Sequence, residues 1–213
     1  MKMMDLRVVK TLESIKNGFV VCIEKKTFSS ITIQEITTAA KINRSTFYKY
    51  YEDKYQLREA LVDETMKELV QSFEQHDLAE KKQIILSADI LKQQLAFMWS
   101  QKDWYMLLWN RNMELYVYED MQQVFEKSLR KSFEPLPQET VEPISIVQKH
   151  ELFSKIFAAS VMANIKWWYK AMPLVPVDAM ITIIMKSVTE GMYSAFSLNT
   201  HMVLKGKTVS EVK

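Results

Sequence analysis

The sequence predicts an all-α protein, and three observations lead to that prediction. The 213 residues include only three glycines and five prolines, which is little material for hairpin turns. Apolar residues recur at spacings of three and four along nearly the whole chain, as expected for helices with one buried face. With 48% apolar residues, a chain of this length can bury the core of one large or two small domains.

The composition also excludes several classes of protein. Cys22 is the single cysteine and cannot form an internal disulfide, and the opening residues MKMMDLRVVK are too charged for a signal peptide. No apolar run approaches the roughly 18 residues that span a bilayer, so we expect a cytoplasmic protein without membrane contacts. His76, His150 and His201 lie far apart, and no glycine-rich phosphate loop or nucleophile motif is present. The sequence therefore predicts no enzyme, no cofactor and no metal site.

One apolar stripe predicts a first helix over about residues 5–25. Its members are Leu6, Val9, Leu12, Ile15, Phe19 and Ile23. Thr32 and Glu35 have the spacing of a capping box, which begins a short second helix that extends to about Ala40. The chain is thus expected to begin with a long helix followed by a very short one.

The next elements complete the pattern of a helix-turn-helix. Asn43 is placed to cap a third helix over residues 44–51, and Asp53 is placed to cap a fourth helix that extends to about Glu74. The three-residue turn over residues 41–43 joins two short helices, as in a helix-turn-helix. In that motif the second helix enters the DNA major groove, where its outer face meets base edges and phosphates.

The third helix carries four aromatic side chains, and the helical period divides them between two faces. Steps of about 100° per residue place Phe47 and Tyr51 together on one side, which we expect to be core. Tyr50 falls on the opposite side with Lys49. We therefore expect Tyr50, and the hydroxyl of Tyr48, to be displayed to a partner.

Charge is unevenly distributed along the chain. The formal net charge is +2, yet residues 1–60 hold eleven Lys and Arg against seven Asp and Glu, which leaves +4 there and −2 in the remainder. A basic excess in the part that contains the helix-turn-helix is compatible with a polyanion partner.

The segment ITIQEITTAAKINRSTFYKYYEDKYQL resembles the N-terminal signature of the TetR (tetracycline-repressor-like) transcriptional regulators. That signature couples an alanine-ended helix, a tight turn, a Thr-apolar-Tyr recognition helix and a lysine a few residues later. Lys41 and Thr27 depart from it, because a glycine is usual at both positions. Lys41 is therefore expected to adopt a left-handed backbone conformation in the turn.

The resemblance implies double-stranded DNA as a partner and suggests contacts by position. The residues implied to hold phosphates are Thr32, Thr46, Tyr48 and Lys54. The residues implied to reach base edges are Gln34, Arg44, Ser45, Lys49 and Tyr50. Side-chain chemistry agrees with this division, because hydroxyls and a lysine suit phosphate oxygens and an arginine can bind guanine bidentately.

The C-terminal half contains a segment rich in Trp, Met and Tyr, FMWSQKDWYMLLWNRNMELYVY, over residues 97–118. Such side chains can line a deformable apolar pocket, although we expect most of them to be ordinary core. The candidate ligand-binding residues are Trp99, Tyr105, Trp109, Asn110, Met113, Phe157, Asn164 and Trp168. A ligand bound there would be a small, mostly apolar effector.

The last two helices leave two alternatives open from the residues alone, burial within the monomer or a dimer interface. Apolar residues extend almost around the helix over 151–170, which is more than one buried face needs. Ser187, Gly191 and Ala195 form a track of small residues, along which another helix can approach closely. The resemblance extends over residues 80–198 and implies a homodimer with a four-helix interface, which would present two recognition helices to a palindromic operator.

The resemblance also implies a domain division and a function. Residues 1–54 are expected to form the DNA-binding domain, and residues 55–213 a helical ligand-binding and dimerisation domain. The implied function is transcription regulation, by a repressor that a small ligand releases from DNA. The alternative is a coactivator or interaction protein of the same fold that acts through a protein partner, as the coactivators associated with dihydroxyacetone kinase do. One set of residues favours DNA, because a protein that had abandoned DNA would not need its cationic and hydroxyl groups. The set is Arg44, Thr46, Tyr48, Lys49 and Lys54.

Overall fold

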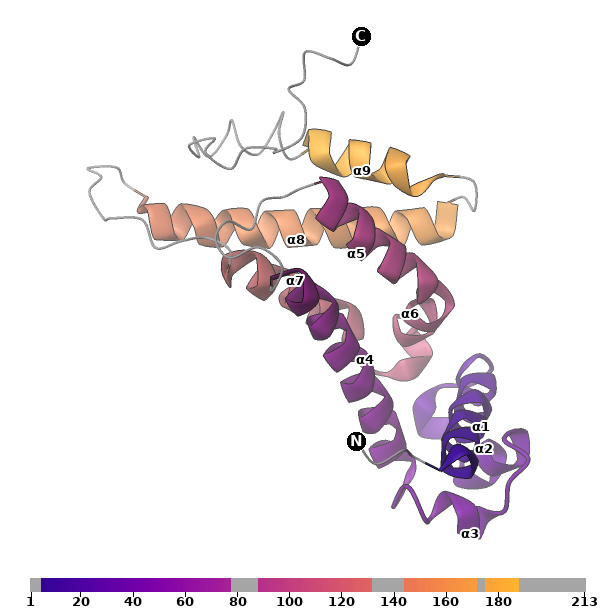
Figure 1. Ribbon diagram of the computed structural model, residues 1–213. Coiled ribbons are helices and arrows are strands. Elements are labelled where there is room, and N and C mark those ends of the chain that lie inside the picture. Colours follow the sequence, from indigo (N-terminus) through magenta and orange to yellow (C-terminus); the bar gives the residue numbers. More distant parts are fainter. Residues whose placement is uncertain (1–4, 78–87, 132–143, 172–174, 188–213) are drawn as a thin grey trace. The chain divides into compact units, whose positions relative to one another are not determined.

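The computed structural model describes residues 5–77, 88–131, 144–171 and 175–187 (Figure 1). The regular secondary structure within these ranges is entirely helical, which confirms the predicted all-α class. None of the described helices is long and apolar enough to cross a bilayer.

The chain is divided into two compact units, and each unit combines segments that are distant in the sequence. The first unit comprises Met1–Glu68 and Asp103–Tyr118, and the second comprises Leu69–Lys102 and Glu119–Lys213. The first unit therefore contains residues from both sides of the sequence-based boundary at residue 54. The division into a DNA-binding domain over residues 1–54 and a second domain over residues 55–213 remains a prediction.

The first unit contains the predicted helix-turn-helix. In chain order its elements are α1 (Leu6–Ile23), η1 (Phe28–Ser30), α2 (Ile33–Ala39), α3 (Arg44–Phe47), the first part of α4 (Lys54–Asp77), most of α6 (Lys102–Leu108) and η2 (Arg111–Met113). Phe19 of α1, Ile36 of α2, Phe47 of α3 and Leu57 of α4 are fully buried. These side chains form the core beneath the two short helices.

Gly18 allows α1 to pack closely against α2. A Cβ atom built at this position would lie 2.6 Å from the carbonyl oxygen of Ile36 and 2.8 Å from both the Cβ and the backbone nitrogen of Ala40. Carbon atoms do not approach backbone atoms so closely, so a side chain at this position would force the two helices apart.

The local capping signals fix most of the predicted helix starts in the first unit. The Asp53 carboxylate accepts the backbone N–H of Gln56 at 2.8 Å, and α4 begins at the next residue, as predicted. The third helix is shorter than the predicted range 44–51, because α3 ends at Phe47. The Lys49 N–H donates to the Thr46 carbonyl at 3.3 Å and the Tyr50 N–H to the Phe47 carbonyl at 3.0 Å. Both bonds run three residues back, so the chain continues as tighter turns rather than as α-helix.

The second unit is a helical bundle. Its described elements are the rest of α4, α5 (Ala88–Ser100), most of α7 (Val117–Lys131), α8 (Ile146–Ala171) and α9 (Val177–Lys186). Helix α9 packs against both α5 and α8 (Figure 1), and an ion pair between Lys92 and Asp178 at 2.7 Å joins α5 to α9. The Tyr169 hydroxyl on α8 donates to the Met98 carbonyl on α5. Of the predicted small-residue track, only Ser187 is within the described residues, and Gly191 and Ala195 lie outside them.

Candidate nucleic-acid interface

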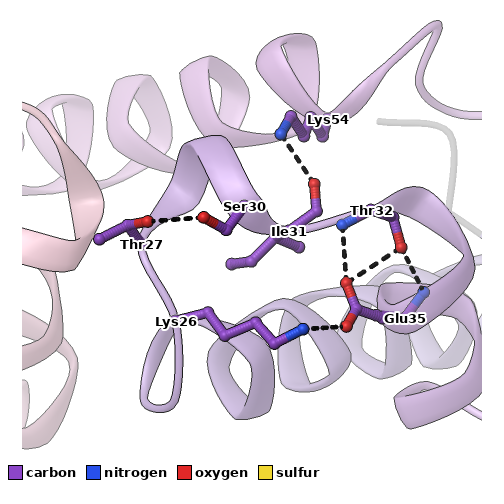
Figure 2. Close-up of polar contacts among 7 residues, drawn as sticks. All are labelled: Lys26, Thr27, Ser30, Ile31, Thr32, Glu35 and Lys54. Atoms are coloured by element: carbon purple, nitrogen blue, oxygen red, sulfur yellow. Dashed lines mark hydrogen bonds and ion pairs between the residues drawn. The ribbon is translucent and has the colours of Figure 1, made fainter.

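The start of α2 is held by the predicted capping box. The Thr32 hydroxyl accepts the backbone N–H of Glu35, and the Glu35 carboxylate accepts the backbone N–H of Thr32 at 3.0 Å (Figure 2). The Thr32 hydroxyl also donates to the same carboxylate at 3.0 Å. The hydroxyl proton that a phosphate would need is therefore already engaged in this structure.

Glu35 has a second partner, which joins the end of α1 to the start of α2. The other carboxylate oxygen of Glu35 pairs with the Lys26 ammonium (Figure 2). The bond from Lys26, followed by the bonds from Thr32, lowers the pKa of Glu35 to about 2. Lys26 thus neutralises an acid that would otherwise repel a phosphate near the first helix of the motif.

The turn between α2 and α3 is a Schellman motif with a lysine at its left-handed position. Lys41 has a φ of 56°, which confirms the left-handed backbone conformation that was predicted for it. The Lys41 N–H donates to the Thr38 carbonyl at 3.2 Å, and the Ile42 N–H donates to the Thr37 carbonyl at 3.1 Å. These two bonds define the motif, so the turn keeps its geometry without glycine.

Helix α3 begins after Asn43, but the Asn43 side chain does not cap it. Asn43 stands at the N-cap position and makes no side-chain bond to the described helix, so the predicted side-chain cap is wrong. Its backbone carbonyl instead accepts the N–H of Thr46 at 2.9 Å. Phe47 is fully buried, which confirms its predicted place in the core, and Tyr51 packs beside it with ring centroids 5.8 Å apart.

The outer side of α3 and of the turn that follows is polar and basic. The predicted contact residues here have different exposures: Arg44, Ser45, Tyr48 and Lys49 are exposed, and Thr46 and Tyr50 are half-buried. On α2, the exposed Gln34 amide donates to the Thr38 hydroxyl at 3.2 Å. The structure thus brings the candidates on α3 and the following turn together on one short segment.

Arg44 and Tyr48 make the closest side-chain contact on this surface. The Arg44 guanidinium donates to the Tyr48 hydroxyl from Nε at 3.3 Å and from Nη2 at 3.0 Å. The guanidinium carbon also lies 5.5 Å from the centroid of the Tyr48 ring. The spacing of four residues was visible in the sequence, but the contact was not predicted.

Lys54, a predicted phosphate contact, is engaged with η1. Its ammonium donates to the carbonyls of Phe28 at 2.9 Å, Ser29 at 2.9 Å and Ile31 at 2.7 Å, the last of which is drawn in Figure 2. An ammonium has three donors, so all of them are used. A phosphate contact by Lys54 would require at least one of these bonds to be exchanged.

Residues that are distant in the sequence hold the helix-turn-helix in place, and their contacts were not predicted. Arg58 donates to the Met113 carbonyl at 2.9 Å and lies 3.7 Å from the Phe28 ring centroid. The Asn112 amide donates to the Ile23 carbonyl at 2.8 Å. These contacts link residues 55 and 89 positions apart, and no local pattern in the sequence signals them.

The candidate ligand-binding residues are divided between the two units. Tyr105, Trp109, Asn110 and Met113 belong to the first unit, and Trp99, Phe157, Asn164 and Trp168 belong to the second. Several of the polar atoms already have internal partners. The Trp168 indole donates to the Val175 carbonyl, the Asn164 amide donates to the Ser160 carbonyl, and the Asn110 side chain caps η2.

Tyr105 differs from the other ligand candidates. Its side chain is 1% exposed, and among the described residues no atom accepts or donates a hydrogen bond to its hydroxyl. Burial, followed by the charge of Glu68, raises the pKa of Tyr105. Its ring is stacked on Trp109 with centroids 6.1 Å apart.

In the part of the chain that the structure describes, no three His, Cys, Asp or Glu side chains are grouped as metal ligands.

Comparison with known sequences places the helix-turn-helix in a family. The model of the family described as "Bacterial regulatory proteins, tetR family" matches residues 20–61. The chain is 36% identical over 70 residues to the HTH-type transcriptional regulator YxbF of Bacillus subtilis (strain 168). That alignment covers 32% of this chain and 18% of the relative, so the chain matches about a fifth of the relative's length.

Comparison with solved structures shows the same fold over most of the chain. The dihydroxyacetone kinase operon activator DhaS is similar with a TM-score of 0.52 and 13% identity, over 88% of this chain and 96% of that one. A transcriptional regulator from Aquifex aeolicus VF5, described as TerR/AcrR family, is similar with a TM-score of 0.55 and 19% identity, over 84% of this chain and 97% of that one. At these identities the likeness is one of fold.

Proposed function

We propose that this chain, whose residues 20–61 match the TetR family of bacterial transcriptional regulators, is a repressor. As a homodimer it binds a palindromic operator, and it leaves the operator when a small, mostly apolar effector binds. The observation that carries the proposal is the exposure of Arg44, Ser45 and Lys49 on and just after the second helix of a helix-turn-helix. Side chains on this helix reach base edges and phosphates when it enters a major groove.

The exposed face of α8 supports the homodimer. Leu152, Ile156 and Trp167 are 47%, 39% and 53% exposed, and they fall within about 60° of one another around the helix. Ile183 on α9 is 46% exposed. Large apolar side chains gathered on one helix face favour association, because a partner removes them from water. A two-fold axis would bring the same face of a second copy against them.

Tyr105 and Trp109 support the effector. A hydroxyl that is buried without a partner costs about 1 to 3 kcal/mol, and a ligand that hydrogen-bonds to it would recover that cost. The flanking aromatic rings suit an apolar ligand body. The effector releases DNA only if it prefers the conformation that binds DNA poorly, and the coupling is then reciprocal between the two ligands.

A gel-shift assay with the DNA that flanks the gene for this protein tests the proposal. The parent chain is expected to retard this duplex at a concentration that leaves a scrambled duplex free. Lys49→Ala is expected to weaken the shift, whereas Lys67→Ala, which removes an exposed lysine of α4, is expected to keep it. If the parent shifts neither duplex, the result favours the alternative function, in which an interaction protein of the same fold acts through a protein partner.

A further inference from the structure

We infer that the Tyr48 hydroxyl positions the Arg44 guanidinium for base recognition, so that Tyr48 determines sequence preference in addition to its expected phosphate contact. This inference rests on the proposed function, because it needs DNA as the ligand. It differs from the expectation for a phosphate contact, which carries little sequence information.

The geometry uses one particular edge of the guanidinium. Nε and Nη2 of Arg44 both donate to the Tyr48 hydroxyl oxygen, at 3.3 and 3.0 Å. These two nitrogens form the side edge of the planar group. The end edge, made by Nη1 and the second hydrogen of Nη2, points away from the tyrosine because the group is planar and rigid.

Tyr48 is itself anchored, so it can hold the arginine in place. Its ring packs edge-on against the Phe47 ring, with centroids 5.7 Å apart and an interplanar angle of 89°. Phe47 is fully buried. The Tyr48 backbone N–H also donates to the Arg44 carbonyl at 3.2 Å, so the two residues are joined through both backbone and side chains.

This arrangement orders a long side chain before DNA binds. An exposed arginine samples many rotamers, and fixing them on binding reduces affinity. The bonds to Tyr48 remove part of that cost and direct the end edge of the guanidinium outward. An arginine edge of this kind matches the O6 and N7 acceptors of guanine in the major groove.

The Tyr48 hydroxyl can serve both contacts at once. It accepts the bonds from Arg44 through its lone pairs, so its own proton remains available to a phosphate oxygen. The positive charge of Arg44 makes that proton a stronger donor. The phosphate that sets the register of the protein and the base that Arg44 reads are then linked through one oxygen atom.

A double-mutant cycle on defined DNA tests the inference. The probe is a duplex that the parent protein selects from a randomised library, together with every single base-pair substitution of that duplex. Arg44→Ala should abolish a preference of roughly 5- to 150-fold at one G·C pair. Tyr48→Phe should lower the preference at the same pair several-fold and leave the preferences at other pairs unchanged. In the Arg44→Ala background, Tyr48→Phe should lower affinity for all duplexes by one common factor.

A matched control and a DNA-free measurement keep the roles apart. Tyr55→Phe, which alters another exposed tyrosine, should leave every preference unchanged. In the free protein, the Arg44 Nε–H should exchange with water more slowly in the parent than in Tyr48→Phe, as side-chain NMR would show. The inference is overturned if Tyr48→Phe lowers affinity for all duplexes equally, or if the two exchange rates are the same. A parent that selects no sequence overturns the proposed function as well, so the two failures are distinguishable.

Discussion

The Glu114 carboxylate accepts two hydrogen bonds from Ser29, one from its backbone N–H at 3.1 Å and one from its hydroxyl at 2.8 Å. The two residues are 85 positions apart in the sequence. Glu114 has a left-handed backbone with φ of 55°, which turns the chain after η2 toward η1. Together with the bonds from Asn112 and Arg58, this contact joins η2 to the helix-turn-helix, and both lie in the first unit.

Removal of the Glu114 carboxylate should therefore destabilise the helix-turn-helix unit. Glu114→Ala is expected to lower the free energy of unfolding by about 1 kcal/mol, because it removes the acceptor of both the Ser29 N–H and the Ser29 hydroxyl. Denaturant unfolding followed by circular dichroism measures this change. Glu59→Ala removes an exposed acid of α4 and is the control, which should stay within about 0.5 kcal/mol of the parent. Equal stability of the two variants would contradict a structural role for the contact.

Gly18→Ala should destabilise the protein, although alanine normally stabilises a helix relative to glycine by about 1 kcal/mol. The added Cβ would meet the Ile36 carbonyl and Ala40, so the expected loss is about 1 to 3 kcal/mol. Asn17→Ala, at an exposed neighbouring position of α1, should be neutral or slightly stabilising. Thermal unfolding of both variants checks the sign, and a gain of stability in Gly18→Ala would show that α1 and α2 are not packed so closely.

Stability should depend on pH through Glu35. Its folded pKa of about 2 lies below the ordinary value of 4.5, so the ionised carboxylate stabilises the fold fully above about pH 4.5. That contribution is lost as the pH falls through the folded pKa. Melting temperatures of the parent should therefore fall more between pH 5 and pH 2 than those of Glu35→Gln. Glu13→Gln, on the exposed side of α1, should follow the parent, and parallel curves for all three proteins would contradict the role of the Lys26 pair.

Ile156→Glu should dissociate the proposed homodimer, because a buried carboxylate without a partner is strongly disfavoured at an apolar interface. Sedimentation velocity at micromolar concentration should show a dimer for the parent and a monomer for the variant. Gln123→Glu adds the same charge at an exposed position of α7 and should remain dimeric. A monomeric parent, or a dimer that tolerates Ile156→Glu, would exclude this face of α8 as the interface.

Features set by neighbouring residues could be predicted from the sequence. The capping box of Thr32 and Glu35 and the cap by Asp53 depend on residues three positions apart, so a linear pattern contains them. The left-handed Lys41 followed from the resemblance to a family in which glycine is usual there. The helical class followed from the periodicity of apolar residues along the whole chain.

Contacts between distant segments could not be predicted from one sequence. Nothing near Glu114 indicates Ser29 as its partner, and the close approach at Gly18 depends on the packing of a second helix. The capture of Lys54 by η1 carbonyls arises because three backbone acceptors converge only after the chain has folded. The end of α3 was placed too late because an apolar and aromatic pattern continues into the turns after Phe47.

Hydroxyl-radical footprinting of the operator tests the central claim most directly, namely that two recognition helices of a homodimer bind successive major grooves. The duplex is the one that flanks the gene and is shifted in the gel assay. Two protected patches should appear on one face of the DNA. Their centres should be separated by about 10 base pairs, which is roughly 34 to 36 Å, or by a multiple of that spacing. Arg44→Ala should weaken the protection of both patches together. A single patch, or uniform protection that Arg44→Ala does not change, would contradict the account.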